Sequence, residues 1–253
     1  MKAVLMYHSL DDSGSAISLD PKTFSSHVRW LASGLVRVLP LELLPGDAED
    51  GDAVALTFDD AFTSFESVAA PLLREHDLPA TVFVVSGRTG GTNSWGGVTD
   101  PRIPTLQLLD WEAIGKLCRD GFTIGAHTRT HPRLGSLSGS RLTDEIAGSA
   151  VDIEAHVGAR PTSFAYPYGE LCAEAIECVR NNYGYACTTD LRVFSGDEDF
   201  VMLPRLDAYY FRTPASIEAW GSPAFLRSVR RRAFARRVRS HIRERLQLGK
   251  GIA

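Results

Sequence analysis

The sequence predicts an α/β fold built around parallel strands. Apolar segments with the composition of strands alternate with amphipathic segments that have helical spacing, and each strand–helix pair takes roughly 30–45 residues. In a barrel of parallel strands the carboxyl ends converge on one face, so polar residues at strand ends predict a functional site there. Such residues occur at Tyr7-His8, Asp59-Asp60, His127, Tyr166-Pro167-Tyr168 and Arg205.

Residues 1–85 are predicted to contain two helices and four strands. Asp20 and Pro21 begin a helix that ends before Gly34, because Asp is a favoured N-cap and Pro suits the first helical position. A second helix is predicted over Ala61–Glu75 from its apolar spacing. The strands are Ala3–Tyr7, Leu35–Leu39, Val54–Phe58 and Ala80–Val85.

The alternation continues in residues 86–206. A loop over Gly87–Pro104 contains Trp95, and a loop of this length inside an α/β pattern is more often functional than idle. Asp110 is predicted to cap the next helix. The helices are Trp111–Asp120, Leu142–Val157 and Cys172–Asn181, and the strands are Phe122–Ala126, Thr162–Tyr166, Tyr185–Thr188 and Val201–Leu203.

The composition is ordinary for a soluble globular protein, with 44% hydrophobic and 23% charged residues in a chain of 253. No stretch approaches the ~20 apolar residues of a membrane span, and no signal peptide is visible at the start. We therefore expect a cytoplasmic protein. The cysteines form no C-x-x-C pair, which predicts free buried thiols. They are Cys118, Cys172, Cys178 and Cys187.

Two adjacent carboxylates, Asp59 and Asp60, directly follow the predicted strand Val54–Phe58. One Asp after a strand is often only the N-cap of the next helix, here Ala61–Glu75. Two neighbouring carboxylates repel each other unless a cation lies between them or one of them holds a proton. The pair therefore favours a metal site.

Two histidines, His127 and His131, are four residues apart in the segment H-T-R-T-H. On a helical turn such residues share a face, so both imidazoles could bind one ion; a pair of capping or surface histidines is the alternative. Thr128 stands where the H-E-x-x-H signature would have its base, so the base must come from elsewhere. Two His and one Asp would leave coordination positions for water and substrate.

Three segments resemble the motifs of the polysaccharide deacetylase family, also described as the NodB homology domain or carbohydrate esterase family 4. They are T-F-D-D at Thr57–Asp60, H-T-R-T-H at His127–His131 and F-A-Y-P-Y-G at Phe164–Gly169, in the order that the family has them. The resemblance spans Lys2–Leu206. It implies a distorted (β/α) barrel of about seven strands, which agrees with the alternation of elements.

The resemblance implies a role for each matching residue. Asp60, His127 and His131 would bind one divalent metal ion, with zinc as the default for such ligands at a hydrolytic site. Asp59 would be the general base that activates the attacking water, and the backbone N–H of Tyr168 would help to hold the developing oxyanion. The implied reaction removes N-acetyl groups from an amino sugar in a polysaccharide or glycan precursor.

Two positions depart from the usual family pattern. Position 165 is Ala where the family has an Arg that orients the base, and the segment near Arg205 lacks the usual histidine acid. Both departures resemble the circularly permuted branch that acts on poly-N-acetylglucosamine. In that branch the acid belongs to an N-terminal Y-H motif, matched here by Tyr7-His8. His8 is therefore the candidate acid, and Arg205 the candidate replacement for the missing Arg.

Other functions remain open at this point. The same fold could act as a small-molecule amidase or deformylase, because barrels host many chemistries. A non-catalytic, glycan-binding barrel is a second alternative, although it would need neither a base nor a metal triad. Non-haem iron oxygenases also use two His and one carboxylate, but the hydrolytic base and oxyanion motif fit them poorly.

Aromatic side chains are candidates for stacking on sugar rings at the mouth of the site. They are Trp95, Trp111, Tyr209 and Tyr210. Trp111 begins a predicted helix with apolar residues on the following turns, which favours a packing role for this residue.

The chain is predicted to divide into a barrel, residues 1–222, and a basic amphipathic helix, residues 223–253. Arg227–Lys250 carries +9 and the whole chain −4, which leaves −13 for the remainder. The helix suits an anionic membrane surface at the inner face of the membrane, or it lays its apolar stripe on the barrel. Nucleic acid is disfavoured as a partner, because the acidic remainder would repel phosphate. The stripe is Leu226, Val229, Ala233, Phe234, Val238, Ile242 and Leu246.

Overall fold

The fold is a nearly closed barrel of parallel strands in a computed structural model that describes residues 1–97 and 100–248. Every strand pair in the main sheet is parallel, and β4 (Arg37–Val38) pairs only with β5. A parallel bridge between Cys187 and Leu203 leads from β9 into the segment before β10 and brings the two edges together. The strand order is β10 (Arg205–Asp207), β1 (Lys2–Tyr7), β5 (Ala53–Phe58), β6 (Thr81–Val84), β7 (Thr123–Ala126), β8 (Ser163–Ala165) and β9 (Tyr185–Cys187). The predicted α/β barrel is confirmed.

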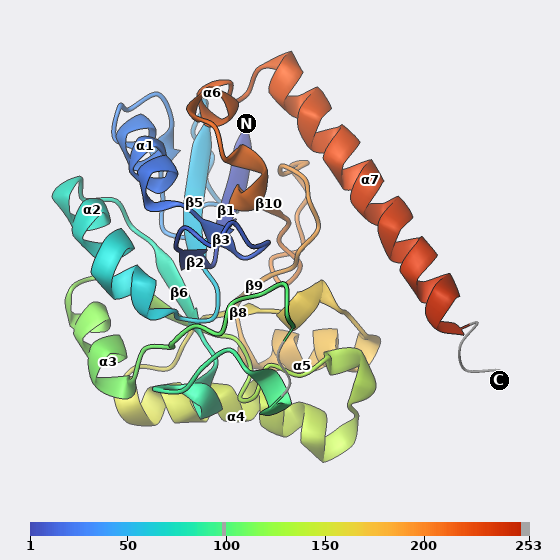
Figure 1. The fold of residues 1–253 in the computed structure, drawn as a ribbon. Coiled ribbons are helices and arrows are strands. Elements are labelled where there is room, and N and C mark those ends of the chain that lie inside the picture. The colour runs from blue at the N-terminus through green and yellow to red at the C-terminus, as the bar shows by residue number, and fades with distance from the viewer. Residues whose placement is uncertain (98–99, 249–253) are drawn as a thin grey trace.

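Helices cover the outside of the strands (Figure 1). Two predicted caps are confirmed, since Asp20 accepts a hydrogen bond from Thr23 N at 2.8 Å and Asp110 accepts one from Ala113 N at 2.9 Å. The helices are α1 (Pro21–Leu31), α2 (Ala70–Glu75), α3 (Trp111–Arg119), α4 (Gly139–Val157), α5 (Ala173–Asn182), α6 (Pro214–Glu218) and α7 (Pro223–Leu248). Two further short strands, β2 (Ser9–Leu10) and β3 (Ser18–Leu19), pair with each other.

The helix predicted over Ala61–Glu75 begins later than expected. The chain first forms a π-helix over Phe65–Ala69 and then continues as α2. Asp60 and Ala61 have φ angles of 71° and 54°, which no right-handed helix accepts. Neither Asp59 nor Asp60 is therefore a helix N-cap, and the capping alternative for this pair is wrong.

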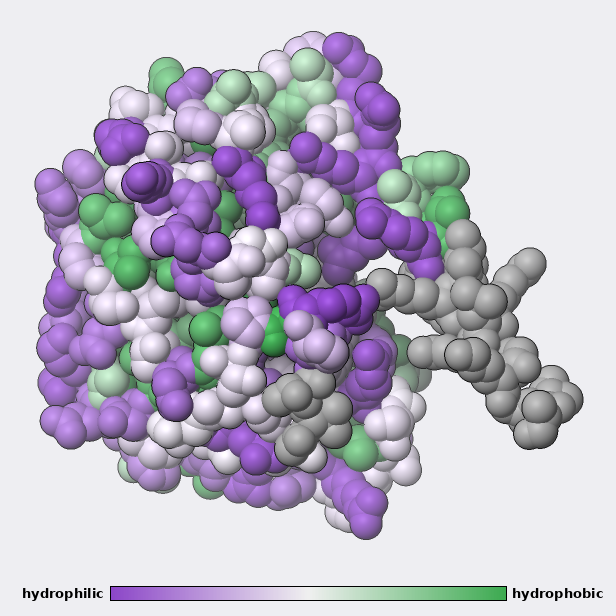
Figure 2. All heavy atoms as spheres, viewed as in Figure 1, coloured by the Kyte–Doolittle hydropathy of each residue, from purple (hydrophilic) through white to green (hydrophobic). Residues whose placement is uncertain are grey.

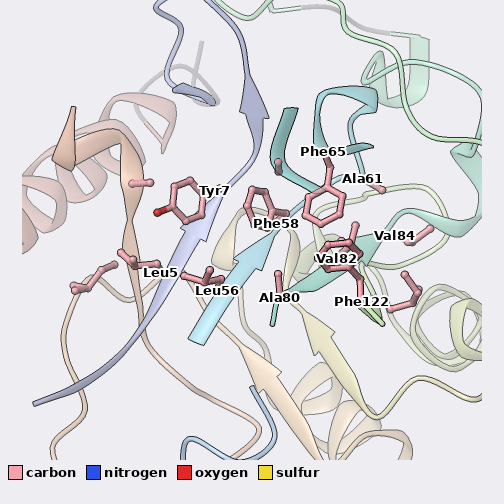
Figure 3. Close-up of a cluster of buried hydrophobic side chains, with 14 of the residues drawn as sticks. Leu5, Tyr7, Leu56, Phe58, Ala61, Phe65, Ala80, Val82, Val84 and Phe122 are labelled. Atoms are coloured by element: carbon pink, nitrogen blue, oxygen red, sulfur yellow. The ribbon is translucent and has the colours of Figure 1, made fainter. Parts of the chain in front are cut away.

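The strands bury both faces, and alternate residues serve two different parts of the core. One face packs under the helices, where Tyr7 stacks on Phe58 at 4.9 Å and Phe58 meets Phe65 edge to face at 4.7 Å (Figure 3). The other face fills the barrel, where Ala53 and Ala55 of β5 pack with other small and apolar residues. Because side chains alternate along a strand, Thr57 and then Asp59 continue the inward-facing series.

The expectation of buried thiols is correct for one cysteine of four. All four cysteines are free, but only Cys187 is buried, and the other three are half-buried. Trp111 packs as expected, because its ring lies parallel to that of His156 on α4, with 4.2 Å between the ring centres.

Helix α7 packs its apolar side chains on the barrel mainly through its first turns, and farther along it Arg237 Nη2 lies 3.6 Å from Asp190 Oδ1. Phe225 and Val229 are buried, whereas Phe234 and Val238 are 69% and 42% exposed. In Figure 2, apolar atoms (green) appear on the part of α7 that stands away from the barrel, next to mainly hydrophilic ones (purple). The predicted tail residues 249–253 and the side chains of Ile242 and Leu246 lie outside the described part of the structure. The division at residue 222 stays a prediction.

Within the part of the chain that the structure describes, every helix is too short or too polar to span a bilayer.

Candidate active site

Seven residues predicted from the sequence lie together at one end of the barrel. They come from the segments that follow β1, β5, β7 and β8 and from the start of β10. The position of Arg205 differs from the expectation, because it begins β10 instead of following a strand. The strand predicted over Val201–Leu203 makes only the bridge from Leu203 to Cys187. The seven residues are His8, Asp59, Asp60, His127, His131, Tyr168 and Arg205.

Asp60, His127 and His131 form a compact set of buried ligand atoms. One atom from each lies within 4.8 Å of the other two, and Asp60 Oδ1 is 3.5 Å from Nε2 of both histidines. Asp60 Oδ1 is buried, and no described residue donates a hydrogen bond to it. His127 Nδ1 donates to the Ala165 carbonyl at 2.7 Å, which leaves the Nε2 lone pair directed toward the cluster. The donor set fits one divalent ion such as zinc.

The electrostatics of these three residues favour a cation among them. Burial and the neighbouring Asp59 carboxylate raise the pKa of Asp60 well above its usual range. Burial lowers the pKa of His127 to about 4, so its imidazole is neutral near pH 7, the form in which histidine binds metals. A divalent ion at this place would stabilise the ionised form of Asp60.

The loop that carries the two histidines is not helical, contrary to the expectation of a helical turn. Thr128 and His131 have φ angles of 65° and 61°, in the left-handed region. Thr128 Oγ1 accepts a hydrogen bond from His131 N at 3.0 Å and closes a tight turn between the two. Such a turn costs of order 1–3 kcal/mol per strained residue. It brings together two imidazoles that an extended strand would hold about 13 Å apart, at about 3.3 Å per residue.

Asp59 forms a buried ion pair with Arg205. The guanidinium donates from Nη1 to Oδ1 at 2.6 Å and from Nη2 to Oδ2 at 2.8 Å. Its Nε donates to the Thr188 carbonyl at 2.8 Å, and Nη1 also reaches Thr57 Oγ1 at 3.3 Å. Burial on its own would raise the pKa of Asp59, but the charge of Arg205 holds it well below its usual range. Asp59 is therefore ionised and fixed in orientation.

His8 lies beside Asp59 and is partly exposed to solvent. Its Nε2 is 3.8 Å from Asp59 Oδ2, and its side chain is 20% exposed. His8 also forms part of the wall of a small hollow together with Ile17, Asp207 and Tyr209. The ring can therefore reach solvent and the carboxylate at once.

Two aromatic rings enclose the His131 imidazole. Trp95 from the Gly87–Pro104 loop stacks on it with 4.4 Å between ring centres, and Tyr168 meets it edge to face at 4.6 Å. Tyr168 has a φ angle of 59° and a side chain at the surface. The next residue, Gly169, has no room for a side chain, because a Cβ there would lie 1.9 Å from Thr189 Oγ1. Tyr168 and Trp95 thus flank the candidate metal centre.

Sequence reasoning missed the residues that hold the histidine loop from behind. Glu145 and Asp152 on α4 bind the backbone and side chain of the segment between His127 and His131. Their spacing gives no signal, because acidic residues on an amphipathic helix ordinarily face water.

Two known proteins are similar to this chain in sequence. YxkH of Bacillus subtilis is 26% identical over 209 residues, which cover 80% of this chain and 70% of that protein. A poly-β-1,6-N-acetyl-D-glucosamine N-deacetylase of Staphylococcus epidermidis is 23% identical over 203 residues, 75% of this chain and 67% of the relative.

Solved structures share the fold. The Streptococcus pyogenes deacetylase PplD aligns with a TM-score of 0.73 at 21% identity, over 87% of this chain and 98% of that one. IcaB from Ammonifex degensii aligns with a TM-score of 0.70 at 23% identity, over 85% of this chain and 95% of that one. The family model described as polysaccharide deacetylase matches residues 46–187, more than half of the chain. The chain therefore belongs to the polysaccharide deacetylase family and is a hydrolase.

Proposed function

We propose that this enzyme removes N-acetyl groups from a poly-N-acetylglucosamine chain. The observation that carries the proposal is the buried Asp59–Arg205 pair beside the Asp60, His127 and His131 cluster, with His8 in place of the missing C-terminal histidine. The relative from Staphylococcus epidermidis carries the name of a deacetylase for a β-1,6-linked polymer of this sugar. This linkage is the first to test.

Each residue of the site has a distinct task in this proposal. A divalent ion, with zinc as the first choice, would be held by Asp60, His127 and His131 and would supply Lewis-acid polarisation of the acyl carbonyl and a more acidic water. Asp59 takes the proton of the attacking water, while Arg205 keeps the carboxylate ionised and in place.

The second half of the reaction needs an acid and an oxyanion partner. The backbone N–H of Tyr168 donates to the oxygen that becomes negative as water adds to the acyl carbon. His8 gives its proton to the sugar nitrogen as the C–N bond breaks. The products are acetate and an amino sugar with a free amine. His8 is suited to this step because it borders both solvent and Asp59.

Acetate release tests the substrate. Purified enzyme should release acetate from β-1,6-linked N-acetylglucosamine oligomers, with clearly lower kcat/KM on β-1,4-linked oligomers and on the monosaccharide. N-formylated small amides are the comparison for the amidase and deformylase alternative. Faster turnover of the small amides would overturn the polysaccharide proposal. Binding of oligomers without acetate release, in metal-loaded protein, would favour the non-catalytic alternative.

Helix α7 supports a further proposal, that the enzyme docks on an anionic lipid surface. Seven arginines and no acidic residue lie between positions 227 and 239. Phe234 and Val238 are exposed on the same stretch of helix. Basic residues near an anionic bilayer contribute about 1 kcal/mol each, and exposed apolar side chains add to this by insertion. Docking at the inner face of the membrane would bring the enzyme beside a lipid-linked glycan precursor.

Co-sedimentation with vesicles tests this docking. The full chain should pellet with vesicles that contain anionic phospholipid at low salt and stay in solution with neutral vesicles. The double substitution Phe234→Ser and Val238→Ser should weaken pelleting severalfold. Leu35→Ser is the matched control, because Leu35 is 75% exposed but belongs to the barrel and not to α7. If the wild-type chain stays in the supernatant with anionic vesicles at low salt, α7 does not bind lipid.

A further inference from the structure

The loop between the two candidate histidine ligands is held by one carboxylate of α4. Glu145 Oε2 accepts hydrogen bonds from Arg129 N at 2.9 Å and from Thr130 N at 2.8 Å. Glu145 Oε1 accepts a third hydrogen bond from Thr130 Oγ1 at 2.6 Å. Two consecutive backbone N–H groups thus converge on a single oxygen, which restrains the main chain of this strained turn.

A second carboxylate of the same helix holds the side chain of the loop. Asp152 accepts from Arg129 Nε and Nη2, both at 2.8 Å. Ser86, which follows β6, donates to the same carboxylate at 2.7 Å. Arg129 also bonds to Asp144. The loop is therefore fixed on one side by α4 and on the other by the segment after β6.

Two glycines permit this close approach. A Cβ on Gly148, between the two acidic residues on α4, would lie 2.7 Å from Arg129 Cζ. A Cβ on Gly87 would lie 2.8 Å from the Arg129 carbonyl oxygen, which accepts a hydrogen bond from Gly87 N at 2.8 Å. On both sides of the loop, therefore, a residue with a side chain would collide with Arg129.

We infer that Glu145 is a positioning residue that sets the metal affinity of the site, with Asp152 in support. The inference rests on the proposed metal role of His127 and His131. These histidines converge on Asp60 only while Thr128 and His131 keep their left-handed backbone conformations. Left to itself, the loop would relax toward the unstrained region and separate the imidazoles. The hydrogen bonds to Glu145 oppose that relaxation. Because the loop is already ordered before the metal binds, the free energy of metal binding is not spent on ordering it.

Metal affinity, measured with the purified chain, tests this inference. We expect Glu145→Ala to raise the Kd for Zn²⁺ by roughly tenfold to 100-fold, the usual effect of removing a group that orients metal ligands. Glu145→Gln keeps one acceptor oxygen for the two N–H groups and should lose less. The measurement is competition with a chromophoric chelator, with Co²⁺ absorption as a second reading of ligand geometry.

Glu154→Ala is the matched control. Glu154 lies on the same helix, is exposed and pairs with Arg160 at 3.1 Å, so its loss should leave the Kd unchanged. Titrations are run at a temperature where circular dichroism finds each metal-free variant folded. If Glu145→Ala does not fold, Thr130→Val carries the test, because it removes only the hydroxyl bond to Glu145 and should weaken binding severalfold.

The outcomes separate this inference from the proposed function. A folded Glu145→Ala or Thr130→Val chain with wild-type Kd would overturn the positioning role and leave the metal centre standing. A wild-type chain that binds no divalent ion would instead overturn the metal centre itself. A lower melting temperature with an unchanged Kd would assign Glu145 to holding α4 against the barrel, and the inference would again fail.

Discussion

Asp59→Asn is expected to abolish nearly all acetate release while the divalent ion stays bound. The substitution keeps the shape of the side chain but removes the group that accepts the proton of water. General bases contribute roughly 10²–10⁴-fold to rate, so kcat should fall by about that factor. Asp59 is not one of the three clustered ligands, and metal content measured by elemental analysis should remain near one ion per chain.

Asp199→Asn provides the matched control for this substitution. Asp199 also pairs with an arginine through two hydrogen bonds, to Arg180 at 3.2 and 2.6 Å, but at the exposed surface of the barrel. Its loss should leave kcat unchanged. Near wild-type turnover in Asp59→Asn would assign the base to another residue. Loss of the metal together with activity would make Asp59 a ligand.

Arg205→Met is expected to be the most destabilising single substitution in the site. It removes the partner of Asp59 and leaves a fully buried carboxylate without its counter-charge. Breaking a buried pair in this way costs about 3–5 kcal/mol of unfolding free energy, and urea denaturation of the metal-free chain measures it. Activity should fall as well, because the carboxylate loses its fixed orientation.

The exposed pair Arg180–Asp199 again gives the comparison. Arg180→Met should cost at most about 1 kcal/mol, since both partners are in contact with solvent. The double variant Asp59→Asn with Arg205→Met should recover part of the loss, because no charge then remains unpaired. Two results would contradict an energetic coupling between Asp59 and Arg205. One is a double variant whose loss of unfolding free energy equals the sum of the two single losses, and the other is a loss in Arg205→Met no larger than in Arg180→Met.

The lowered pKa of Asp59 determines the pH at which the denaturation experiment should be run. The pKa of Asp59 is held well below its usual range in the folded chain. Its contribution to stability is therefore fully present above the usual carboxylate pKa, and it is lost only as the pH falls through the depressed folded value. Measurements near pH 7 contain the whole effect.

The sequence predicted the fold and the residues that gather at the candidate site because both depend on local patterns. Strand composition places Asp59 and Asp60 directly after β5, and alternation along β5 points Asp59 inward. His127 follows β7 for the same reason. The parallel arrangement then brings these strand ends together, so residues far apart in the chain could be assigned to one site before their distances were known.

The errors concern backbone conformation and distant contacts. A helical turn was expected between His127 and His131, but two left-handed residues form a tight loop instead, and neither is a glycine that would signal it. Arg205 was expected to follow a strand over Val201–Leu203. It is instead the first residue of the short strand β10, although it pairs with Asp59, the predicted base. Glu145 acts through contacts with backbone N–H groups, which no residue type reveals.

Anomalous diffraction at the zinc absorption edge, from crystals of wild-type and Asp59→Asn enzyme, separates the three metal ligands from the base. We expect one peak in both crystals, at about 2.0–2.2 Å from an Asp60 carboxylate oxygen and from one ring nitrogen each of His127 and His131. Asp59 and Arg205 should remain paired beside it in the wild-type crystal. A peak on other residues, or one that disappears in Asp59→Asn, would contradict the division of the site into three ligands and a separate base.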